Sequence, residues 1–495
     1  MLVGLVFASF IAYFFFHHLY GKRRNLPPGP TPWPVFGNIF HLDAKYPDRQ
    51  LVEWKKIYGP VFTVWLPGPM VIVADYDVMK ETFVKQGEPY SGRPNSVLNN
   101  ELYRGNYGLF FATGLIWKEN RRFTLHVLRD FGFGRNTLEP LVMEQARELV
   151  SELHKTTKPI NIRDPFLTAM GNVINMLVFG FAFKFEDQRL MLFKDIFEEY
   201  SRIFSSNLGM LVEICPWLRH LDQIVLNIGW KRLMTNYQRV FDYIKQEIDE
   251  HRRTLDADQP PRDYADAYLM EMEKRTKAGE GDLFTDWQMT TTIHDLWSAG
   301  FETTVTTLQC GILLLLNNPS VQEKLHEEID RVIGREQELS MDDQQRLPYL
   351  CATVQELQRA ANIVPLSVQH TVTDDVIING HRIPKGTTVI PQTASLHSDP
   401  ELFHEPEKFR PERFIDDTSG HFIRSEHVLP FSLGKRACVG EHLARMELFL
   451  FLGTLMQRCE FRPVDENRPP PIDYIPGLAR SPVPFLCIVS PRRPI

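Results

Sequence analysis

The sequence is poor in cysteine and has no excess of positive charge. Six of its 495 residues are cysteine, none in a Cys-x-x-Cys pair or grouped with histidines at zinc-site spacing. Such sparse use is typical of free thiols in a reducing compartment. The formal net charge of -7 gives no indication of a broad basic surface for nucleic acid. We also find no internal repeat, no low-complexity tract and no flavin or nicotinamide site.

The chain is long enough to bury a large core and enclose a cofactor. Apolar residues recur at helical spacing in residues 138–155, 231–253, 285–316, 320–333 and 441–456. Shorter runs rich in Val, Ile and Phe predict strands at 60–65, 70–73, 376–383 and 388–390. The expected fold class is therefore mainly α with small β-sheets.

The N-terminus begins with an apolar run over residues 1–20, just long enough to span a bilayer. A cleaved secretory signal is the alternative, but the basic cluster Lys22-Arg23-Arg24 follows the run and no small-x-small cleavage site is evident. The positive-inside rule would leave the rest of the chain in the cytoplasm. We expect an anchor at 1–20, a basic and proline-rich linker at 21–34, and a catalytic domain at 35–495.

A single cysteine, Cys438, lies in the stretch Pro-Phe-Ser-Leu-Gly-Lys-Arg-Ala-Cys-Val-Gly at 430–440, just before a predicted helix. The positive end of that helix, with Arg436 and Lys435, favours the thiolate. A thiolate can be the axial ligand of a haem iron. Gly434 and Gly440 would let the backbone approach a flat macrocycle. The alternative is a small buried side chain without chemistry.

The pattern Phe-x-x-Gly-x-Arg-x-Cys-x-Gly resembles the cysteine-ligand loop of the cytochrome P450 superfamily. Further motifs of that family follow its order along the chain, and residues 364–372 and Arg122-Phe123 resemble the microsomal family-2-type enzymes. The resemblance implies a haem-thiolate fold with one N-terminal transmembrane helix. It also implies that Cys438 binds the iron of haem.

Residues that would contact the haem propionates occur at several places in the chain. Trp117 and Arg121 are four residues apart on one helix face and by themselves indicate a cation–π pair. The resemblance implies instead that both reach a propionate, and that Arg93, His370 and Arg436 do likewise. Buried carboxylates need such donors because an unpaired buried anion is very costly.

The motif Ala299-Gly300-Phe301-Glu302-Thr303-Thr304 lies inside the long helix predicted at 285–316. A mid-helix glycine indicates either a tight helix crossing or an oxygen-binding groove. The resemblance implies the groove, with Glu302 as the acid and Thr303 as the alcohol that deliver protons. Position 301 is often Thr in that family. At about 100° per residue, Phe301 should point away from the face shared by Ala299 and Thr303.

Glu356 and Arg359 are three residues apart, a spacing that usually indicates a weak surface salt bridge. The pair resembles the structural Glu-x-x-Arg motif of the family, and Arg413 matches its third member. Their implied role is structural, because they hold the core on the cysteine side.

The resemblance implies a monooxygenase that inserts one oxygen atom from O2 into a lipophilic molecule, such as a xenobiotic, fatty acid or steroid. Electrons would come from NADPH through NADPH–cytochrome P450 reductase at the endoplasmic reticulum membrane, sometimes with cytochrome b5. The basic residues expected to dock the reductase are Lys118, Arg122, Arg129 and Lys435. The expected substrate contacts are mostly apolar and comprise Phe111, Ala299, Thr303, Val364, Val368 and Leu478. The alternatives are a reductase-independent isomerase or dehydratase of lipid peroxides and a non-enzymatic haem binder.

Overall fold

The computed structural model describes residues 13–17, 21–34, 36–43, 45–66, 68–132, 138–185, 187–204, 212, 216–222, 229–477 and 479–492. The chain divides into two units. The first comprises Met1–Ser96, Val364–Pro406 and His427–Cys438, and the second comprises Val97–Ile363, Glu407–Glu426 and Val439–Ile495.

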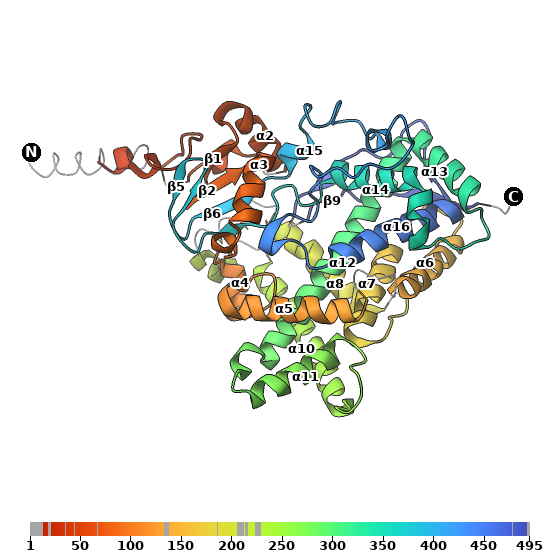
Figure 1. Cartoon of the computed structure of the whole chain (residues 1–495), viewed down its shortest axis with the longest axis horizontal. Coiled ribbons are helices and arrows are strands. Elements are labelled where there is room, and N and C mark those ends of the chain that lie inside the picture. Colours follow the sequence, from red (N-terminus) through yellow and green to blue (C-terminus); the bar gives the residue numbers. More distant parts are fainter. Residues whose placement is uncertain are drawn as a thin grey trace, which may run out of the picture. The chain divides into compact units, whose positions relative to one another are not determined.

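A four-stranded sheet with the strand order β1-β2-β6-β3 forms the centre of the first unit. Its strands are β1 (Val61–Leu66), β2 (Gly68–Val73), β3 (His370–Thr371) and β6 (Thr388–Pro391). The β2–β6 pair is parallel and the other pairs are antiparallel (Figure 1). The helices and helical turns are η1 (Gly21–Arg23), η2 (Ile39–His41), α2 (Pro47–Tyr58), α3 (Tyr76–Met79), η3 (Lys80–Lys85), η4 (Glu88–Tyr90), α15 (Ala394–His397) and η11 (Gly434–Arg436).

The stretch predicted as strand at 376–383 forms a hairpin of β4 (Val376–Ile378) and β5 (His381–Ile383). Asn379 and Gly380 between the strands both have positive φ, at 47° and 82°. Asn-Gly is a favoured pair in two-residue hairpin turns because both residues tolerate this conformation. The sequence signal was therefore correct for strand but missed the reversal of the chain.

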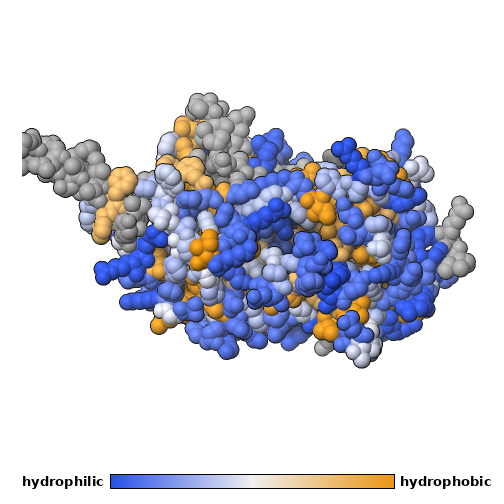
Figure 2. Space-filling model, turned by 90° about the horizontal axis from the view of Figure 1, so that it is seen from above, coloured by the Kyte–Doolittle hydropathy of each residue, from blue (hydrophilic) through white to orange (hydrophobic). Residues whose placement is uncertain are grey.

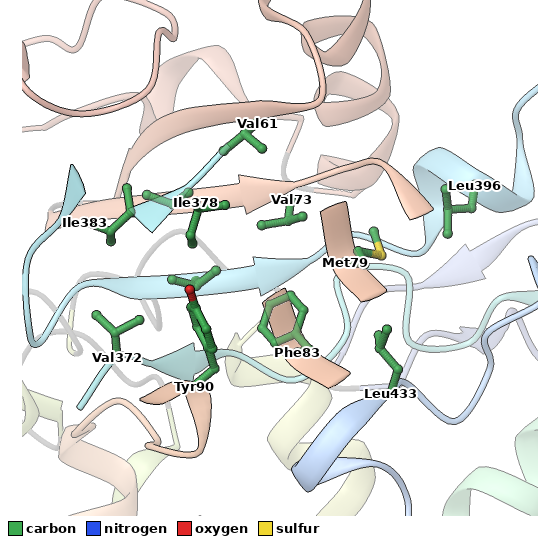
Figure 3. Packing of buried hydrophobic residues seen from close by; sticks show 12 residues of the cluster. Val61, Val73, Met79, Phe83, Tyr90, Val372, Ile378, Ile383, Leu396 and Leu433 are labelled. Carbon is green, nitrogen blue, oxygen red and sulfur yellow. The ribbon is translucent and has the colours of Figure 1, made fainter. Parts of the chain in front are cut away.

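One face of the first unit's sheet packs on a buried cluster that includes the loop before Cys438 (Figure 3). Its buried members are Val61, Val71, Val73, Met79, Phe83, Tyr90, Val372, Ile378, Ile383, Val389, Leu396 and Leu433. A fully buried aliphatic or aromatic side chain contributes about 1.5–3 kcal/mol through removal from water. Leu433 and Phe83 thus attach the cysteine loop to the sheet core.

The second unit is mainly helical. Its helices and helical turns are α4 (Val97–Tyr103), α5 (Gly114–Asp130), α6 (Glu139–His154), α7 (Arg163–Phe179), α8 (Gln188–Phe204), η6 (Pro216–Leu221), α10 (Trp230–Thr254), α11 (Tyr264–Lys277), η8 (Gly281–Leu283), α12 (Asp286–Asn317), α13 (Pro319–Val332), η9 (Met341–Arg346), α14 (Pro348–Ala361), η10 (Pro411–Phe414) and α16 (Glu441–Arg458). It also contains two antiparallel strand pairs, β7 (Cys459–Pro463) with β10 (Cys487–Pro491) and β8 (Tyr474–Ile475) with β9 (Ser481–Pro482). The helices predicted at 138–155, 231–253, 285–316, 320–333 and 441–456 are confirmed.

The long helix α12 is the core helix of the second unit and packs on α7, α10, α14 and α16 (Figure 1). It begins with Thr285, whose side chain accepts a hydrogen bond from the backbone N–H of Gln288. Gly281–Asn317 is the one segment of the described chain that is long and apolar enough to cross a membrane, and 83% of its most apolar window is buried. Burial among other helices explains its apolar composition.

The predicted anchor lies outside the described residues except for a helical fragment at 13–17. The face of the molecule shown in Figure 2 is mainly hydrophilic, and its apolar residues are scattered rather than gathered in one band. The boundaries expected at 20 and 34 stay predictions.

Candidate functional site

Cys438 differs from the other cysteines that the structure describes. It is exposed, whereas Cys310, Cys459 and Cys487 are buried and Cys351 is half-buried. Burial raises the pKa of each of these four thiols to about 12, which keeps them protonated and unreactive. Cys215 lies outside the described residues. Cys438 is therefore the described cysteine best placed to act as an open thiolate ligand.

The loop around Cys438 is fixed by its own backbone. The Cys438 N–H donates to the carbonyl oxygen of Phe431 over 3.0 Å, and α16 begins three residues later, at Glu441. Gly434 has φ +77°, and a Cβ there would lie 1.9 Å from the Phe83 carbonyl oxygen. Contact with η3 therefore requires glycine at position 434, and the expected approach of Gly434 and Gly440 to a macrocycle stays a prediction. A Cβ at Gly440 would meet no protein atom within 4 Å.

Three of the predicted propionate contacts lie near one another in the first unit. Arg436 donates through Nε to the Ser91 carbonyl over 2.7 Å, and Arg93 donates to the Gln369 carbonyl over 2.7 Å. The buried His370 has its Nδ1 2.7 Å from the Tyr90 carbonyl oxygen.

Burial is the main cause that lowers the pKa of His370 to about 3, and the positive charges of Arg93 and Arg436 lower it further. The hydrogen bond to the Tyr90 carbonyl raises this pKa but does not outweigh them. His370 is therefore neutral, so Nδ1 carries the proton that it donates to Tyr90. Two guanidinium groups beside a neutral imidazole form a cluster that favours an anion. This donor set fits the two carboxylates of haem.

The other two predicted contacts lie in the second unit, on α5. Trp117 is buried and Arg121 is half-buried. Their spacing of four residues puts both on one face of the helix. The basic residues expected to dock a partner, Lys118, Arg122 and Arg129, are exposed on the same helix. The fourth, Lys435, is exposed in the first unit.

Ala299 and Thr303 share the open face of α12. The Thr303 hydroxyl donates to the Ala299 carbonyl over 2.7 Å, the usual local bond of a helical threonine. Phe301 is 5% exposed, and its ring fills the space where a Cβ of Gly171 on α7 would stand, 2.8 Å from the ring. A Cβ on Gly300 would lie 2.5 Å from Ile174 of α7. The predicted orientation of Phe301 is confirmed, and Gly300 marks a tight helix crossing.

Glu302, the predicted acid, is paired with Arg163 of α7. Nη2 of Arg163 lies 2.9 Å from each carboxylate oxygen, and the side chains are 13% and 10% exposed. The Thr306 hydroxyl donates to the same carboxylate over 3.3 Å. In this arrangement Glu302 is a charged hydrogen-bond acceptor. Sequence reasoning missed Arg163, because the two residues are far apart in the chain.

A second acid that sequence reasoning missed lies against α12. Glu447 of α16 is 1% exposed, and one of its oxygens accepts a hydrogen bond from the Thr304 hydroxyl over 3.0 Å. Burial raises the pKa of Glu447 to about 8, so this group is mostly protonated at neutral pH. The available signal was a lone glutamate inside the apolar run Met-Glu-Leu-Phe-Leu-Phe-Leu at 446–452.

The three predicted structural residues come together in the second unit. Arg359 Nε lies 2.7 Å from Glu356 Oε2, and Arg413 Nε lies 3.1 Å from Glu356 Oε1. These side chains are between 0% and 5% exposed, so the surface reading of the motif is wrong. The backbone N–H of Arg410 also donates to Glu356. Removal of one partner would leave a buried charge unpaired, which would destabilise the fold. The geometry of the three side chains therefore fits a structural role.

The expected substrate contacts are described in part. Phe111, Val364 and Val368 are half-buried, and Ala299 is exposed. The ring of Phe111 lies 5.5 Å from that of Tyr103 and 4.6 Å from that of Phe110, both edge-on. Leu478 lies outside the described residues.

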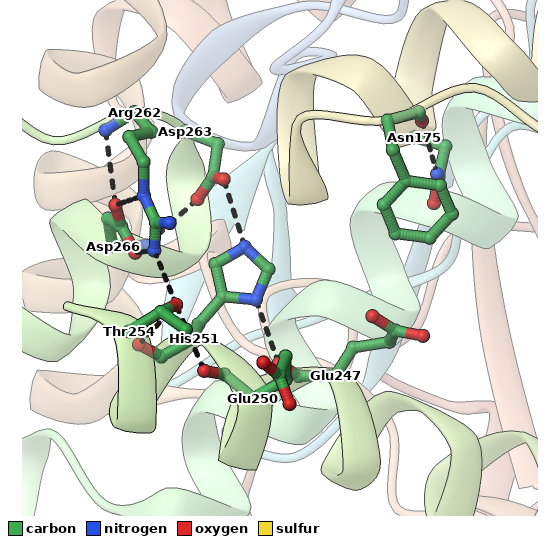
Figure 4. A network of polar contacts seen from close by, with 9 residues as sticks. Asn175, Glu247, Glu250, His251, Thr254, Arg262, Asp263 and Asp266 are labelled. Atoms are coloured by element: carbon green, nitrogen blue, oxygen red, sulfur yellow. Dashed lines mark hydrogen bonds and ion pairs between the residues drawn. The ribbon is translucent and has the colours of Figure 1, made fainter.

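A separate cluster in the second unit has residue types that bind metals (Figure 4). The ligand atoms of His251, Asp263 and Asp266 lie within 4.8 Å of one another. His251 already bonds through Nδ1 to the Glu247 carbonyl (2.8 Å) and through Nε2 to Asp263 (2.9 Å). Arg262 binds Asp266 through Nε over 2.6 Å. Protein partners thus occupy these atoms, and the cluster joins α10 to α11.

Comparison with known proteins agrees with this geometry. Residues 27–489 match the family model for cytochrome P450. A probable cytochrome P450 of Caenorhabditis elegans, CYP36A1, is 40% identical over 491 residues, 99% of each chain. Human cytochrome P450 2C8 is 39% identical over 452 residues, 90% of each chain. Chicken cytochrome P450 2H1 is 38% identical over 474 residues, 95% of this chain and 94% of the relative.

The family binds haem through a cysteine thiolate, and the mainly helical structure with small sheets has the corresponding fold. The chain belongs to the cytochrome P450 family and is a haem-thiolate monooxygenase.

Proposed function

We propose that this chain is a membrane-anchored monooxygenase that inserts one oxygen atom from O2 into a lipophilic small molecule such as a xenobiotic, fatty acid or steroid. Electrons come from NADPH through a membrane-bound reductase, sometimes with cytochrome b5. Residues 1–20 hold the enzyme on the cytoplasmic side of the endoplasmic reticulum membrane. The observation that carries the proposal is the exposed Cys438 thiol in the same unit as Arg93, His370 and Arg436.

Cys438 is the proposed iron ligand. The positive end of α16, which begins at Glu441, favours the thiolate form. Haem, when bound, supplies an iron whose thiolate ligand promotes cleavage of the O–O bond. The proposed partners of its carboxylates are Arg93, Trp117, Arg121, His370 and Arg436.

The open face of α12 has two proposed tasks. Ala299 leaves room for the substrate because its side chain is small. The Thr303 hydroxyl carries a proton that can be delivered to the bound oxygen. Glu302 accepts hydrogen bonds while Arg163 holds it, so it delivers protons through water or after leaving Arg163.

The other proposed substrate contacts are apolar, which favours a lipophilic substrate, and come from Phe111, Val364, Val368 and Leu478. The exposed basic residues Lys118, Arg122, Arg129 and Lys435 attract an acidic reductase surface.

Reconstitution of the full-length enzyme tests this proposal. The chain is combined with NADPH–cytochrome P450 reductase in phosphatidylcholine vesicles and given lauric acid, testosterone and a panel of drugs under isotopically labelled O2. We expect NADPH-dependent products that carry one labelled oxygen. NADPH-independent rearrangement of a lipid hydroperoxide would instead indicate an isomerase or dehydratase.

Cysteine variants identify the iron ligand in the same preparation. Cys438→Ser should abolish turnover and the red-shifted absorption of the carbon monoxide complex of the reduced protein. Cys459→Ser, at a buried cysteine, is the matched control and should retain both. Retention of both by Cys438→Ser would contradict the assignment.

A further inference from the structure

Buried polar groups fasten the segment between α4 and α5 to α12. Asp295 is 6% exposed and accepts three hydrogen bonds from this segment. The Tyr103 hydroxyl donates to Oδ1 over 2.7 Å, and the backbone N–H groups of Leu109 and Phe110 donate to Oδ2 over 2.6 and 2.8 Å. Hydrogen bonds to a buried charged acceptor are among the stronger ones. The carboxylate therefore ties the last residue of α4 and the middle of the segment to α12.

Gln288, two helical turns before Asp295 on α12, adds a second attachment. The Gly108 N–H donates to Oε1 of Gln288 over 2.9 Å, and Nε2 of Gln288 donates to the Gly108 carbonyl over 3.1 Å. The side-chain amide thus pairs with one peptide unit in the manner of a β-ladder. This attachment does not involve Tyr103.

The hydrogen atoms in this network can be assigned from its geometry. A carboxylate only accepts, so the proton of Tyr103 points to Asp295. His294 Nδ1 lies 3.1 Å from the same Tyr103 oxygen, and because that oxygen has already donated its proton, Nδ1 must be the donor. His294 is 5% exposed. Its ring packs against those of Tyr103, Tyr237 and Phe241, with centroids 5.9, 5.5 and 5.1 Å away.

Tyr103 transmits this restraint to the expected substrate contact Phe111. The two rings meet edge-on with centroids 5.5 Å apart. Tyr103 is 2% exposed, so its ring has little space in which to move. The place of Phe111 therefore depends on the phenol, and that of the phenol depends on His294 and Asp295.

We propose that His294 is a specificity-determining positioning residue, which acts by fixing Tyr103 and through it the orientation of Phe111 toward substrate. The inference rests on the proposed oxygenase function, because Phe111 is a substrate contact only there. His294 itself touches neither substrate nor cofactor in this proposal. Its loss should broaden the range of products without loss of haem.

The test compares His294→Leu, which removes the donor and keeps an apolar side chain, with His294→Asn, whose amide nitrogen can take the place of Nδ1. Tyr264→Phe is the matched control, because the Tyr264 hydroxyl is also buried and lies 2.7 Å from Thr124 Oγ1. Each holoenzyme is examined by amide hydrogen exchange at Leu109 and Phe110 and by the positions at which lauric acid is hydroxylated.

We expect His294→Leu to speed exchange at both amides about tenfold, the change that corresponds to loss of one hydrogen bond worth about 1.4 kcal/mol. The ratio of lauric acid products should shift at least about threefold, because a change of that size needs only a fraction of the same free energy. His294→Asn should restore both values, and Tyr264→Phe should change neither. Should His294→Leu fail to fold, Tyr103→Phe removes the shared oxygen and should give the same pattern.

Unchanged exchange and product ratio in an active His294→Leu enzyme would overturn the inference and leave the proposed function intact. Absence of any NADPH-dependent product from the wild-type enzyme would overturn the proposed function. The exchange measurement does not depend on turnover and still reports whether His294 holds the segment.

Discussion

Glu302 of α12 and Glu447 of α16 are two acids near the centre of α12 that differ in how the surrounding residues compensate for burial. Glu302 faces the guanidinium of Arg163, with both carboxylate oxygens 2.9 Å from one nitrogen. Glu447 bonds the neutral hydroxyl of Thr304, and burial raises its pKa to about 8. A paired carboxylate keeps its charge, whereas one that meets only a hydroxyl keeps its proton. The two acids therefore differ both in partner and in depth of burial, since the Glu302 side chain is 13% exposed and Glu447 is 1% exposed.

The difference matters for the oxygen motif because Thr303 and Thr304 are adjacent. Thr304 donates to Glu447, whereas Glu302, which precedes Thr303 in the chain, is held by Arg163. The comparison can be tested by altering each partner in turn.

Arg163→Leu should have the largest effect on stability. It leaves Glu302 buried without its cation, which typically costs about 3–5 kcal/mol. We expect this loss in chemical unfolding of the holoenzyme. The double variant Arg163→Leu with Glu302→Leu removes both charges and should recover most of the loss. If the single variant loses less than about 1 kcal/mol, the pair is not the buried ion pair described above.

Glu447→Gln should change how stability depends on pH. The folded-state pKa of Glu447 is about 8 against an ordinary value of 4.5, so between these values the folded protein holds a proton that the unfolded chain has released. Wild-type stability should therefore fall as pH rises, by about 2 kcal/mol between pH 6 and pH 8 from this group. Glu447→Gln stays neutral and should lack that part of the fall. Equal slopes for the two proteins in urea unfolding would contradict the assignment.

The ion pair between His251 and Asp263 should give a smaller pH-dependent change in stability, in which the cation is the group that titrates. Burial lowers the pKa of His251, but the hydrogen bonds that its ring donates to Asp263 and to the Glu247 carbonyl outweigh burial, so the pKa lies above its ordinary value of 6.5. The ion pair with Asp263 should stabilise fully below pH 6.5 and be lost as pH rises through the folded-state pKa. His251→Asn should remove about 1 kcal/mol of this pH-dependent stability. Thermal unfolding from pH 6 to pH 9 measures it, and parallel curves would refute it.

Helices and strands with strong apolar periodicity could be predicted because local sequence determines them. The orientation of Phe301 followed from the helical repeat alone, and α12 confirms it. Arg163 could not be predicted, because its pairing with Glu302 depends on how α7 crosses α12. The close approach at Gly434 could not be predicted for the same reason. Its glycine is required by the Phe83 carbonyl, a contact between segments remote in sequence.

The fit of Phe301 against Gly171 also constrains how these enzymes can diverge. A larger residue at 171 would collide with the ring, and a smaller residue at 301 would leave a void, so either change alone destabilises the fold. Across related sequences, the side chains at positions 171 and 301 should therefore change size in opposite directions. Lineages with a small residue at 301 should tolerate alanine or a larger residue at 171, whereas those that keep phenylalanine should keep glycine. Independent drift at these positions across related sequences would show that the backbone moves to accommodate either change.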